Sequence, residues 1–416
     1  MAENMPTQAL PFAGLKVIDC ASFIAGPAAA TILADFGADV IKVEPLEGDP
    51  YRGLYQVPGS PASDANYPWE LDSRNKRSLA IDLKRLRGVA VLHRLVAQAD
   101  IFVTNLPLPA RARLAIDHAS LAPLNARLIY ASLTAYGESG PEAAKTGFDA
   151  TAYWARSGLM DLIRPDHAAP PARAVAGLGD HPTATALFAA IATALYRRER
   201  TGQGGLVSTS LLANGLWANG VQVQATLGGV AYPPRPPRHQ APNALANVYL
   251  CADGRWLNLV ILNEQMVPAL LHALGDPSLL NDARLTSPAL RGAHNLEAIA
   301  LLDLCFAQHS LATWRVKLDA AGVTFGIINT LAEVAFDEQA RQAQALVPFA
   351  DGDGWTVASP LQLQGLKQRS PERAPYLGQH SAQVLHQAGY TSTDIAQLID
   401  EGIVLDGTDP SAAIAQ

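Results

Sequence analysis

One carboxylate is marked by its surroundings: Asp180 follows two glycines and directly precedes a long alanine-rich stretch in GLGDHPTATALF. An Asp at the start of a helix commonly acts as its N-cap, because its side-chain oxygen accepts a free backbone N–H. The alternative is a nucleophilic carboxylate, since glycines let a ligand approach the backbone and a helix N-terminus stabilises negative charge. In that case the N–H groups around Gly177 and Gly179 are candidate oxyanion donors. The local sequence leaves both roles of Asp180 open.

Cationic side chains gather near two expected strands. Lys76, Arg77 and Lys84 flank the stretch SLAIDL in NKRSLAIDLK, and Arg111 and Arg113 follow the stretch ADIFVTN. Most clusters of this kind are solvated surface. The alternative is a phosphate-binding rim, because strand ends in a parallel sheet face the ligand crevice.

Several other chemistries lack their motifs. The strand-to-helix turn in DCASFIAGPAAA resembles a nucleotide-binding turn, but it holds only Gly26 where a dinucleotide site needs G-x-G-x-x-G. The chain has no P-loop, H-E-x-x-H or G-x-S-x-G motif, and its 10 histidines show no ligand spacing. We therefore expect no metal, nicotinamide or flavin.

Composition argues against two classes of partner. The net charge is -7 and the basic residues are scattered, so we expect no nucleic-acid partner. The longest strongly apolar stretch, 184–196, is shorter than the ~20 residues that a membrane-spanning helix needs, so we expect no membrane partner. The 3 cysteines are far apart, and the N-terminus lacks a signal-peptide pattern. Both features favour a cytoplasmic location.

The elements that must position these residues alternate between strand and helix. Expected strands cover residues 15–22, 38–44, 78–83, 99–105 and 126–137, and expected helices cover 27–37, 88–99, 110–116 and 181–200. This order is typical of a doubly wound α/β fold to about residue 150. Farther on, NVYLCADGRWLNLVIL predicts a hairpin that turns at Asp253-Gly254. AGVTFGIINTL predicts a strand that returns toward the first domain, and two short helices are expected in the tail.

Together these segments resemble the family III CoA-transferases, the group of formyl-CoA transferase and the carnitine CoA-transferases, related to alpha-methylacyl-CoA racemase. The resemblance covers most of the chain, through GLKVIDCASFIAGPAAATILADFGADVIKVE, GDPYRG, NKRSLAIDLK, ADIFVTN, GFDATAYWARSGLM, GLGDHPTA, RRERTGQG, NVYLCADGRWLNL and PYLGQHSAQVL. It implies a Rossmann-like large domain with a parallel sheet built from both chain ends, a smaller inserted α+β domain and an interlocked homodimer. Residues 1–205 would begin the large CoA-binding domain, 206–242 would be a linker, 243–330 the small domain and 331–416 the return segment.

The resemblance implies an enzyme that transfers coenzyme A from an acyl-CoA to a free carboxylic acid. Asp180 matches the family's nucleophile, on which a mixed anhydride and then an aspartyl-CoA thioester would form. Two alternatives stay open: an acyl-CoA racemase or isomerase of the same fold, and a non-catalytic acyl-CoA-binding protein in which Asp180 only caps its helix. Phe148 argues against the racemase, because the racemases have a histidine there and phenylalanine cannot move a proton.

The family's CoA contacts fall on four segments. They are Ser22, Phe23, Ile24 and Ala25 after the first strand, Ile81 and Lys84 for the nucleotide, Asn105 and Leu106 for the pantetheine with Arg113 for a phosphate, and Lys145, Gly147, Phe148 and Asp149 over the thioester. Formyl-CoA transferase has a glutamine in place of Ile24, an arginine in place of Pro45 and a glycine-rich flap where residues 233–242 are proline-rich. Substrate and gating are therefore expected to differ.

Overall fold

The computed structural model describes residues 10–407, which divide into two compact units. Unit 1 takes the described residues up to Leu159, then Arg173–Gln224, and the described residues from Gln339 onward. Unit 2 takes Met160–Ala172 and Ala225–Glu338. The chain therefore leaves unit 1 and returns to it, and the domain boundaries expected from the sequence stay a prediction.

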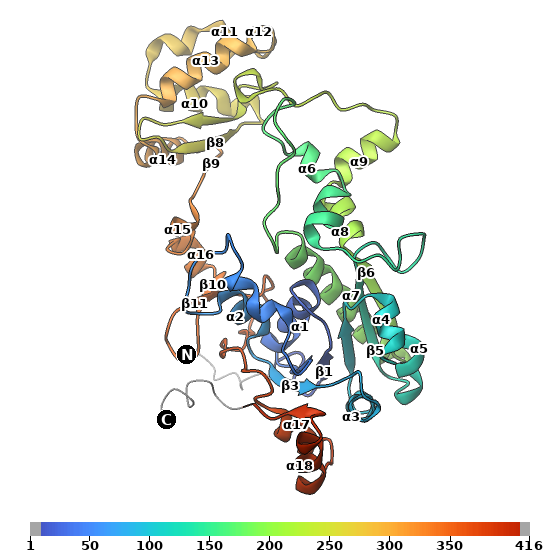
Figure 1. The fold of residues 1–416 in the computed structure, drawn as a ribbon. Helices are drawn as coiled ribbons and strands as arrows, with labels where there is room; N and C mark the ends of the chain where they lie inside the picture. The colour runs from blue at the N-terminus through green and yellow to red at the C-terminus, as the bar shows by residue number, and fades with distance from the viewer. Residues whose placement is uncertain (1–9, 408–416) are drawn as a thin grey trace. The chain divides into compact units, whose positions relative to one another are not determined.

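Unit 1 is built on a mainly parallel sheet. Within residues 10–407 this sheet has 7 strands in the order β12-β3-β2-β1-β4-β5-β6 (Figure 1). Every neighbouring pair is parallel except β12 and β3, which are antiparallel. The strands are β1 (Lys16–Asp19), β2 (Asp39–Glu44), β3 (Arg77–Ile81), β4 (Ile101–Thr104), β5 (Ile129–Thr134), β6 (Gly205–Ser210) and β12 (Val404–Leu405). The prediction of a mixed α/β fold with a parallel sheet is confirmed.

Helices cover both faces of this sheet because successive strand residues point to opposite sides. Val17 packs with helices α1 and α7 in one core, and the next residue, Ile18, packs with α3, α17 and α18 in another. The covering helices are α1 (Ala25–Asp35), α3 (Leu86–Val96), α7 (Asp180–Thr201), α17 (Ser381–Gln387) and α18 (Ser392–Asp400). Helix α7 ends at Thr201, and the next residue, Gly202, caps it in the left-handed conformation with a φ of 73°.

Shorter elements complete unit 1. The helices are η1 (Pro50–Gln56), α2 (Tyr67–Ser73), α4 (Leu108–Arg113), α5 (His118–Leu121), η2 (Ala122–Leu124), η3 (Asp149–Ala155), α8 (Leu211–Ala218) and α16 (Glu338–Gln342). Strands β10 (Leu346–Pro348) and β11 (Trp355–Val357) form an antiparallel pair. Helices α6 (Leu159–Leu162) and α9 (Gly220–Leu227) lie where the chain passes between the units.

Unit 2 combines a small antiparallel sheet with helices around one core. Strands β7 (Ala246–Leu250) and β8 (Trp256–Val260) form the hairpin predicted around Gly254, and β9 (Phe325–Ile327) pairs with β8. Trp314 is buried in this core, and its indole N–H donates to the carbonyl oxygen of Phe306 at 2.8 Å. The helices are η4 (Arg238–Gln240), η5 (Glu264–Met266), α10 (Val267–Leu274), η6 (Pro277–Asn281), α11 (Ala283–Thr286), α12 (Pro288–Ala293), α13 (Asn295–Phe306), α14 (Leu311–Ala320) and α15 (Leu331–Val334).

Two sequence expectations differ from the observed elements. The first part of the segment expected as a linker, 206–227, forms β6, α8 and α9, because β6 pairs in register with β5 and completes the sheet. The strand in AGVTFGIINTL does not return to the first domain. It is β9, whose Phe325 and Ile327 pack against the core of unit 2.

Candidate active site

Two loops meet where the strand order reverses, between the neighbouring strands β1 and β4. The Ser22 N–H donates to the Oδ1 of Asn105 at 2.8 Å, and the Asn105 Nδ2 donates to the carbonyl oxygen of Ser22 at 2.7 Å. Ligands of doubly wound α/β folds bind outside the carboxyl ends of the strands at such a switch point. These reciprocal bonds bring together two of the segments that the resemblance assigned to CoA.

A buried acid fixes the loop after β1. The Oδ1 of Asp49 accepts from the hydroxyl of Ser22 at 2.8 Å and from the N–H of Phe23 at 3.3 Å. Phe23 has a φ of 60°, which is unusual for a residue with a side chain. The Nζ of Lys42 lies 2.7 Å from the other oxygen of Asp49. The buried Asp49 carboxylate therefore holds the loop in one conformation.

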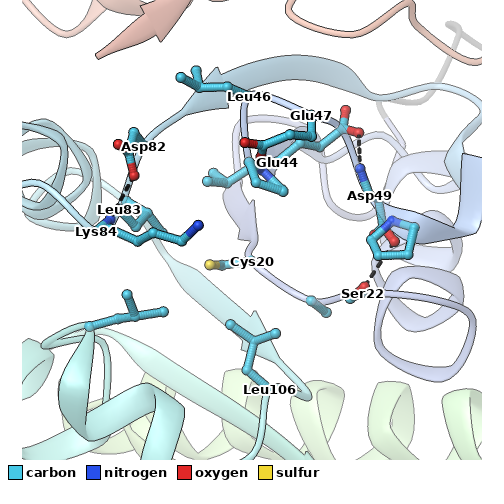
Figure 2. Close-up of a pocket in the computed structure, with 15 residues that line it drawn as sticks. Cys20, Ser22, Glu44, Leu46, Glu47, Asp49, Asp82, Leu83, Lys84 and Leu106 are labelled. Carbon is cyan, nitrogen blue, oxygen red and sulfur yellow. Dashed lines mark hydrogen bonds between the residues drawn. The ribbon is translucent and has the colours of Figure 1, made fainter. Parts of the chain in front are cut away.

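A cavity of about 320 Å³ lies beside this loop, at the carboxyl ends of β1, β2, β3 and β4 (Figure 2). Three of the residues assigned to CoA line it: Ser22, Lys84 and Leu106. Figure 2 shows the Lys84 side chain pointing into the cavity toward Cys20, where its ammonium can meet an anionic ligand. Four acidic residues also line the cavity, Glu44, Glu47, Asp49 and Asp82, and sequence reasoning assigned none of them a role there.

Six other expected CoA contacts come from the same segments of the chain as the lining residues of this cavity. Phe23, Ile24, Ala25, Ile81, Asn105 and Arg113 are not among its lining residues. Arg113 is exposed at the end of α4, with Leu114 next to it in the cavity wall. Arg111 is buried and donates to the carbonyl oxygens of Leu106 and Leu133, so it supports the loop after β4. Its guanidinium is thereby engaged within the protein.

Asp180 is the first residue of α7, and the N-cap is Gly179, without a side-chain capping bond. The position that the sequence suggested as a cap is therefore already inside the helix. Gly177 has a φ of +91°, and a Cβ on Gly179 would lie 2.6 Å from the ring of Tyr153. Only glycine fits both places, since one needs a left-handed backbone and the other close approach.

Asp149 holds the turn that contains Gly177 and Gly179. Its buried carboxylate accepts from the N–H of Gly177 at 2.9 Å and from the N–H of Gly179 at 3.2 Å, both at Oδ2. Both of the N–H groups expected to face an oxyanion are thus engaged in this structure. An oxyanion role for them stays a prediction, and it requires that Asp149 share these donors with the ligand.

The environment of Asp180 disfavours ionisation of its carboxyl group. Burial and the nearby carboxylates of Asp149 and Asp72 raise the pKa of Asp180 to about 7, while His181 opposes this rise. The imidazole of His181 lies 3.0 Å from Asp72, whose other oxygen accepts from the hydroxyl of Tyr51 at 2.6 Å. Sequence reasoning gave neither Asp72 nor Tyr51 a role, although Tyr51 lies in the segment GDPYRG that contributes to the resemblance, because both are distant in the chain from His181.

The segment expected over the thioester spreads over different environments. Phe148 is 58% exposed and meets the ring of Phe23 edge to face, with centroids 5.5 Å apart. Gly147 packs closely against Ala135, where a Cβ would lie 2.9 Å from the neighbouring Cβ. Lys145 is exposed, and its Nζ lies 3.1 Å from Glu142. Phe148 is thus the member of this segment that joins the loop after β1.

The chain is similar to known transferases over almost its whole length. The profile of CoA-transferase family III matches residues 12–381. (R)-2-hydroxy-4-methylpentanoate CoA-transferase of Clostridioides difficile is 32% identical, and the match covers 94% of this chain and 98% of the relative. Cinnamoyl-CoA:phenyllactate CoA-transferase of Clostridium sporogenes is 31% identical, over 93% of this chain and 95% of the relative. The crystal structure of a CAIB/BAIF family protein from Brucella suis matches with a TM-score of 0.81 at 29% identity, over 92% of this chain and 100% of that one.

The fold and these similarities define an α/β enzyme that transfers coenzyme A, with acyl-CoA as its substrate. The chain belongs to CoA-transferase family III, and the resemblance seen in the sequence is confirmed. Residues 10–407 contain no group of three or more His, Cys, Asp or Glu side chains placed to hold a metal ion. Across the same described residues, no helix has both the length and the apolar character needed to cross a membrane.

Proposed function

We propose that this enzyme transfers CoA between carboxylic acids through covalent intermediates on Asp180. The carboxylate attacks the acyl-CoA carbonyl, the C–S bond breaks, and a mixed anhydride and CoA thiolate result. The thiolate then attacks the Asp180 carbonyl, releases the donor acid and leaves an aspartyl-CoA thioester. The acceptor carboxylate reverses both steps and leaves as the new acyl-CoA. Each step exchanges one acyl bond for another, so no further reactant is required.

The observation that carries this proposal is the state of Asp180 at the start of α7. Its pKa is raised to about 7 by burial and by Asp149, so its carboxylate is a stronger nucleophile than an ordinary aspartate. A group with such a pKa still ionises near neutral pH. The helix N-terminus also favours negative charge that develops beside it.

The loop after β1 supports a route for the CoA moiety from the cavity to this turn. Lys84 and Ser22 lie at the cavity, and two residues after Ser22 the side chain of Ile24 comes 3.7 Å from the Cβ position of Gly177. The loop after β1 therefore spans the distance between the cavity and the turn that carries Asp180. We propose that the nucleotide occupies the cavity and that the thioester end follows this loop.

Apolar side chains favour an acid with a branched or aromatic group. Phe23, Ile24 and Phe148 pack near the turn, and Leu178 within it is 51% exposed. Two relatives are named for branched or aromatic hydroxy acids, 2-hydroxy-4-methylpentanoate and phenyllactate. We propose the same class of acceptor for this enzyme.

A dicarboxylate acceptor would need a free cation near the turn. Arg52, Arg156 and Arg173 could each bind a second carboxylate, but two of them are already paired. The Nε of Arg52 lies 2.7 Å from Glu44, and Arg156 lies 3.0 Å from Glu142. A second carboxylate would have to displace one of these acids or use the exposed Arg173. The pairing of the first two arginines supports a monocarboxylic acceptor.

The test uses acyl-CoA donors, acetyl-CoA and succinyl-CoA, with a panel of branched, aromatic and dicarboxylic acids. Mass spectrometry of digested enzyme should find CoA, or hydroxamate after hydroxylamine treatment, on Asp180. Asp180→Asn should show neither adduct nor CoA exchange while keeping its circular dichroism spectrum. A label on a different carboxylate contradicts the proposal. Exchange of α-hydrogen for deuterium without an acceptor acid would instead support an isomerase.

A homodimer is the second part of this proposal. Helix α8 carries Trp217, which is 87% exposed, and the following helix carries Val221, which is 75% exposed. Side chains of this kind mark interaction surfaces when they lie together on a monomer. We propose that a second copy of the chain covers them.

A further inference from the structure

The imidazole of His181 lies between two hydrogen-bond acceptors. Its Nε2 is 3.0 Å from the Oδ1 of Asp72, and its Nδ1 is 3.0 Å from the carbonyl oxygen of Gly177. Neither a carbonyl oxygen nor an ionised carboxylate can donate. Both hydrogen bonds therefore require His181 to donate from both ring nitrogens.

Only the imidazolium form has two N–H donors, because neutral imidazole has one donor and one acceptor nitrogen. A neutral His181 would place a nitrogen lone pair against one of the two acceptor oxygens. Gly177 makes the short contact possible: a Cβ there would lie 3.3 Å from the Nδ1 and Cε1 of His181. Gly177 therefore leaves room for the His181 ring and also gives the turn its left-handed backbone conformation.

Asp72 takes part in hydrogen bonds through both of its carboxylate oxygens. It is buried in α2, and its second oxygen accepts from the hydroxyl of Tyr51 at 2.6 Å. Its main-chain oxygen accepts from Thr31 at 2.6 Å and from Lys76 at 2.7 Å, which fixes the backbone at this point. A cation at a helix N-terminus is normally disfavoured by the helix dipole, and the Asp72 carboxylate offsets that effect for His181.

We propose that the Asp72–His181 pair is a fixed charge device for the nucleophile: Asp72 holds His181 as an imidazolium, and this cation keeps the neighbouring Asp180 ionised. The inference rests on the proposed nucleophilic role of Asp180. His181 acts through Asp180 and is a positioning residue in this scheme. Burial lowers the pKa of His181, but the hydrogen bond and charge of Asp72, the carbonyl of Gly177 and the charge of Asp180 together raise it above the ordinary value.

The charges around Asp180 explain why a cation is needed. Asp149 from η3 and Asp72 from α2 both repel its negative charge, and the Tyr51 hydroxyl from η1 is also close enough to interact electrostatically. His181 from α7 is the group that lowers the pKa of Asp180. The acids make the carboxylate more nucleophilic, and the imidazolium keeps enough of it ionised near neutral pH.

The first test measures the charge of His181 without any catalysis. Enzyme labelled with ¹⁵N-histidine is titrated by NMR, and the His181 signals are assigned by their loss in His181→Asn. We expect both ring nitrogens to be protonated at neutral pH, with a midpoint above the ordinary histidine value of about 6.5. Asp72→Asn should lower this midpoint by about one pH unit or more. A wild-type midpoint at or below the ordinary value overturns the proposal.

The second test follows Asp180 itself, in enzyme labelled with ¹³C-aspartate and assigned by Asp180→Asn. His181→Asn should move the Asp180 midpoint up by about one pH unit, since a cation at short range is lost. His294→Asn, on the surface of unit 2, is the matched control and should leave it unchanged. In the transfer assay the same shift predicts about tenfold slower aspartyl-CoA formation near pH 6 and almost no change near pH 9.

These results separate the inference from the proposed function. A folded His181→Asn enzyme whose Asp180 midpoint matches wild type overturns the charge device, even if CoA is found on Asp180. If the midpoints are raised as expected but no CoA is found on Asp180, the charge device stands and the proposed nucleophilic role of Asp180 is refuted. If His181→Asn does not fold, His181→Gln supplies the assignment, and the NMR comparison of wild type with Asp72→Asn decides the charge of His181.

Discussion

The ammonium of Lys42 lies 2.7 Å from the Oδ2 of Asp49, and both side chains are almost completely buried. Lys42 and Asp49 come from the strand β2 and from the residue before η1, and together they hold the loop after β1. Burial alone would lower the pKa of Lys42, but the charges of Asp49, Asp19 and Glu44 raise it. The pair is therefore charged at neutral pH, directly beneath the proposed CoA route.

Asp49→Asn is expected to lower the free energy of unfolding by about 3–5 kcal/mol, because it removes the ion-pair partner of the buried Lys42. It should also raise the KM for acyl-CoA, since Ser22 and Phe23 lose part of their support. Urea unfolding and steady-state kinetics measure the two effects. The control is Asp351→Asn, which breaks an exposed pair with Arg373 and should cost less than about 1 kcal/mol. Equal losses in the two variants would contradict the prediction.

Asp180→Asn is expected to stabilise the protein at alkaline pH. The pKa of Asp180 is raised from 3.8 to about 7, so the fold loses stability as the pH rises through this interval and the carboxylate ionises. Removing the charge should raise the free energy of unfolding by about 1–3 kcal/mol near pH 8, below the full value because solvent partly screens the site. Thermal unfolding at about pH 4 should show almost no difference between variant and wild type. An equal gain in the free energy of unfolding at both pH values would show that the effect comes from packing and not from charge.

The rate of CoA transfer in wild type is expected to rise with pH through a midpoint near 7, because only ionised Asp180 attacks and its pKa is raised to about 7. The measurement is the pH dependence of kcat/KM, which reports groups of the free enzyme. A rate that is flat between about pH 5 and pH 8 would show that an ordinary carboxylate is the nucleophile.

Gly179→Ala is expected to displace the nucleophile. The added Cβ would lie 2.6 to 2.9 Å from atoms of Tyr153, so the turn must move and Asp180 with it. A displacement of a catalytic group by about 1 Å typically costs about 10²-fold in kcat. Gly220→Ala is the matched control, because a Cβ there meets no atom within 4 Å. Equal activity of both variants would remove the geometric argument for this turn.

Trp217→Asp is expected to weaken self-association. Trp217 is 87% exposed on α8, and a charge at the centre of an apolar interface is strongly disfavoured. Sedimentation velocity should show a dimer for wild type and a larger monomer fraction for the variant. The control is Trp355→Asp, since Trp355 is 50% exposed on β11, which Figure 1 shows apart from α8. A wild-type monomer over the accessible concentration range contradicts the proposed homodimer.

The sequence by itself determined the parallel sheet, the helix that begins beside Asp180 and the hairpin around Gly254. These features follow from local rules: alternating apolar strands, glycines just past helix ends, and short turn motifs. The switch point between β1 and β4 also follows from the order of strands and helices once the sheet is known. Ser22, Lys84, Asn105 and Leu106 were named through the family resemblance, and the structure places them at or beside that switch point.

Only the tertiary structure decided which polar groups meet. Asp49 reaches Ser22 from 27 residues away, and Asp72 reaches His181 from 109 residues away. No local pattern encodes such pairs, because they depend on how α2 and η1 pack beside α7 and β1. The same packing decided that Asp149 binds the glycine turn and that Asp180 ionises only near neutral pH. A carboxylate's charge state is set by the burial and neighbours that folding gives it, so its chemistry is settled only in three dimensions.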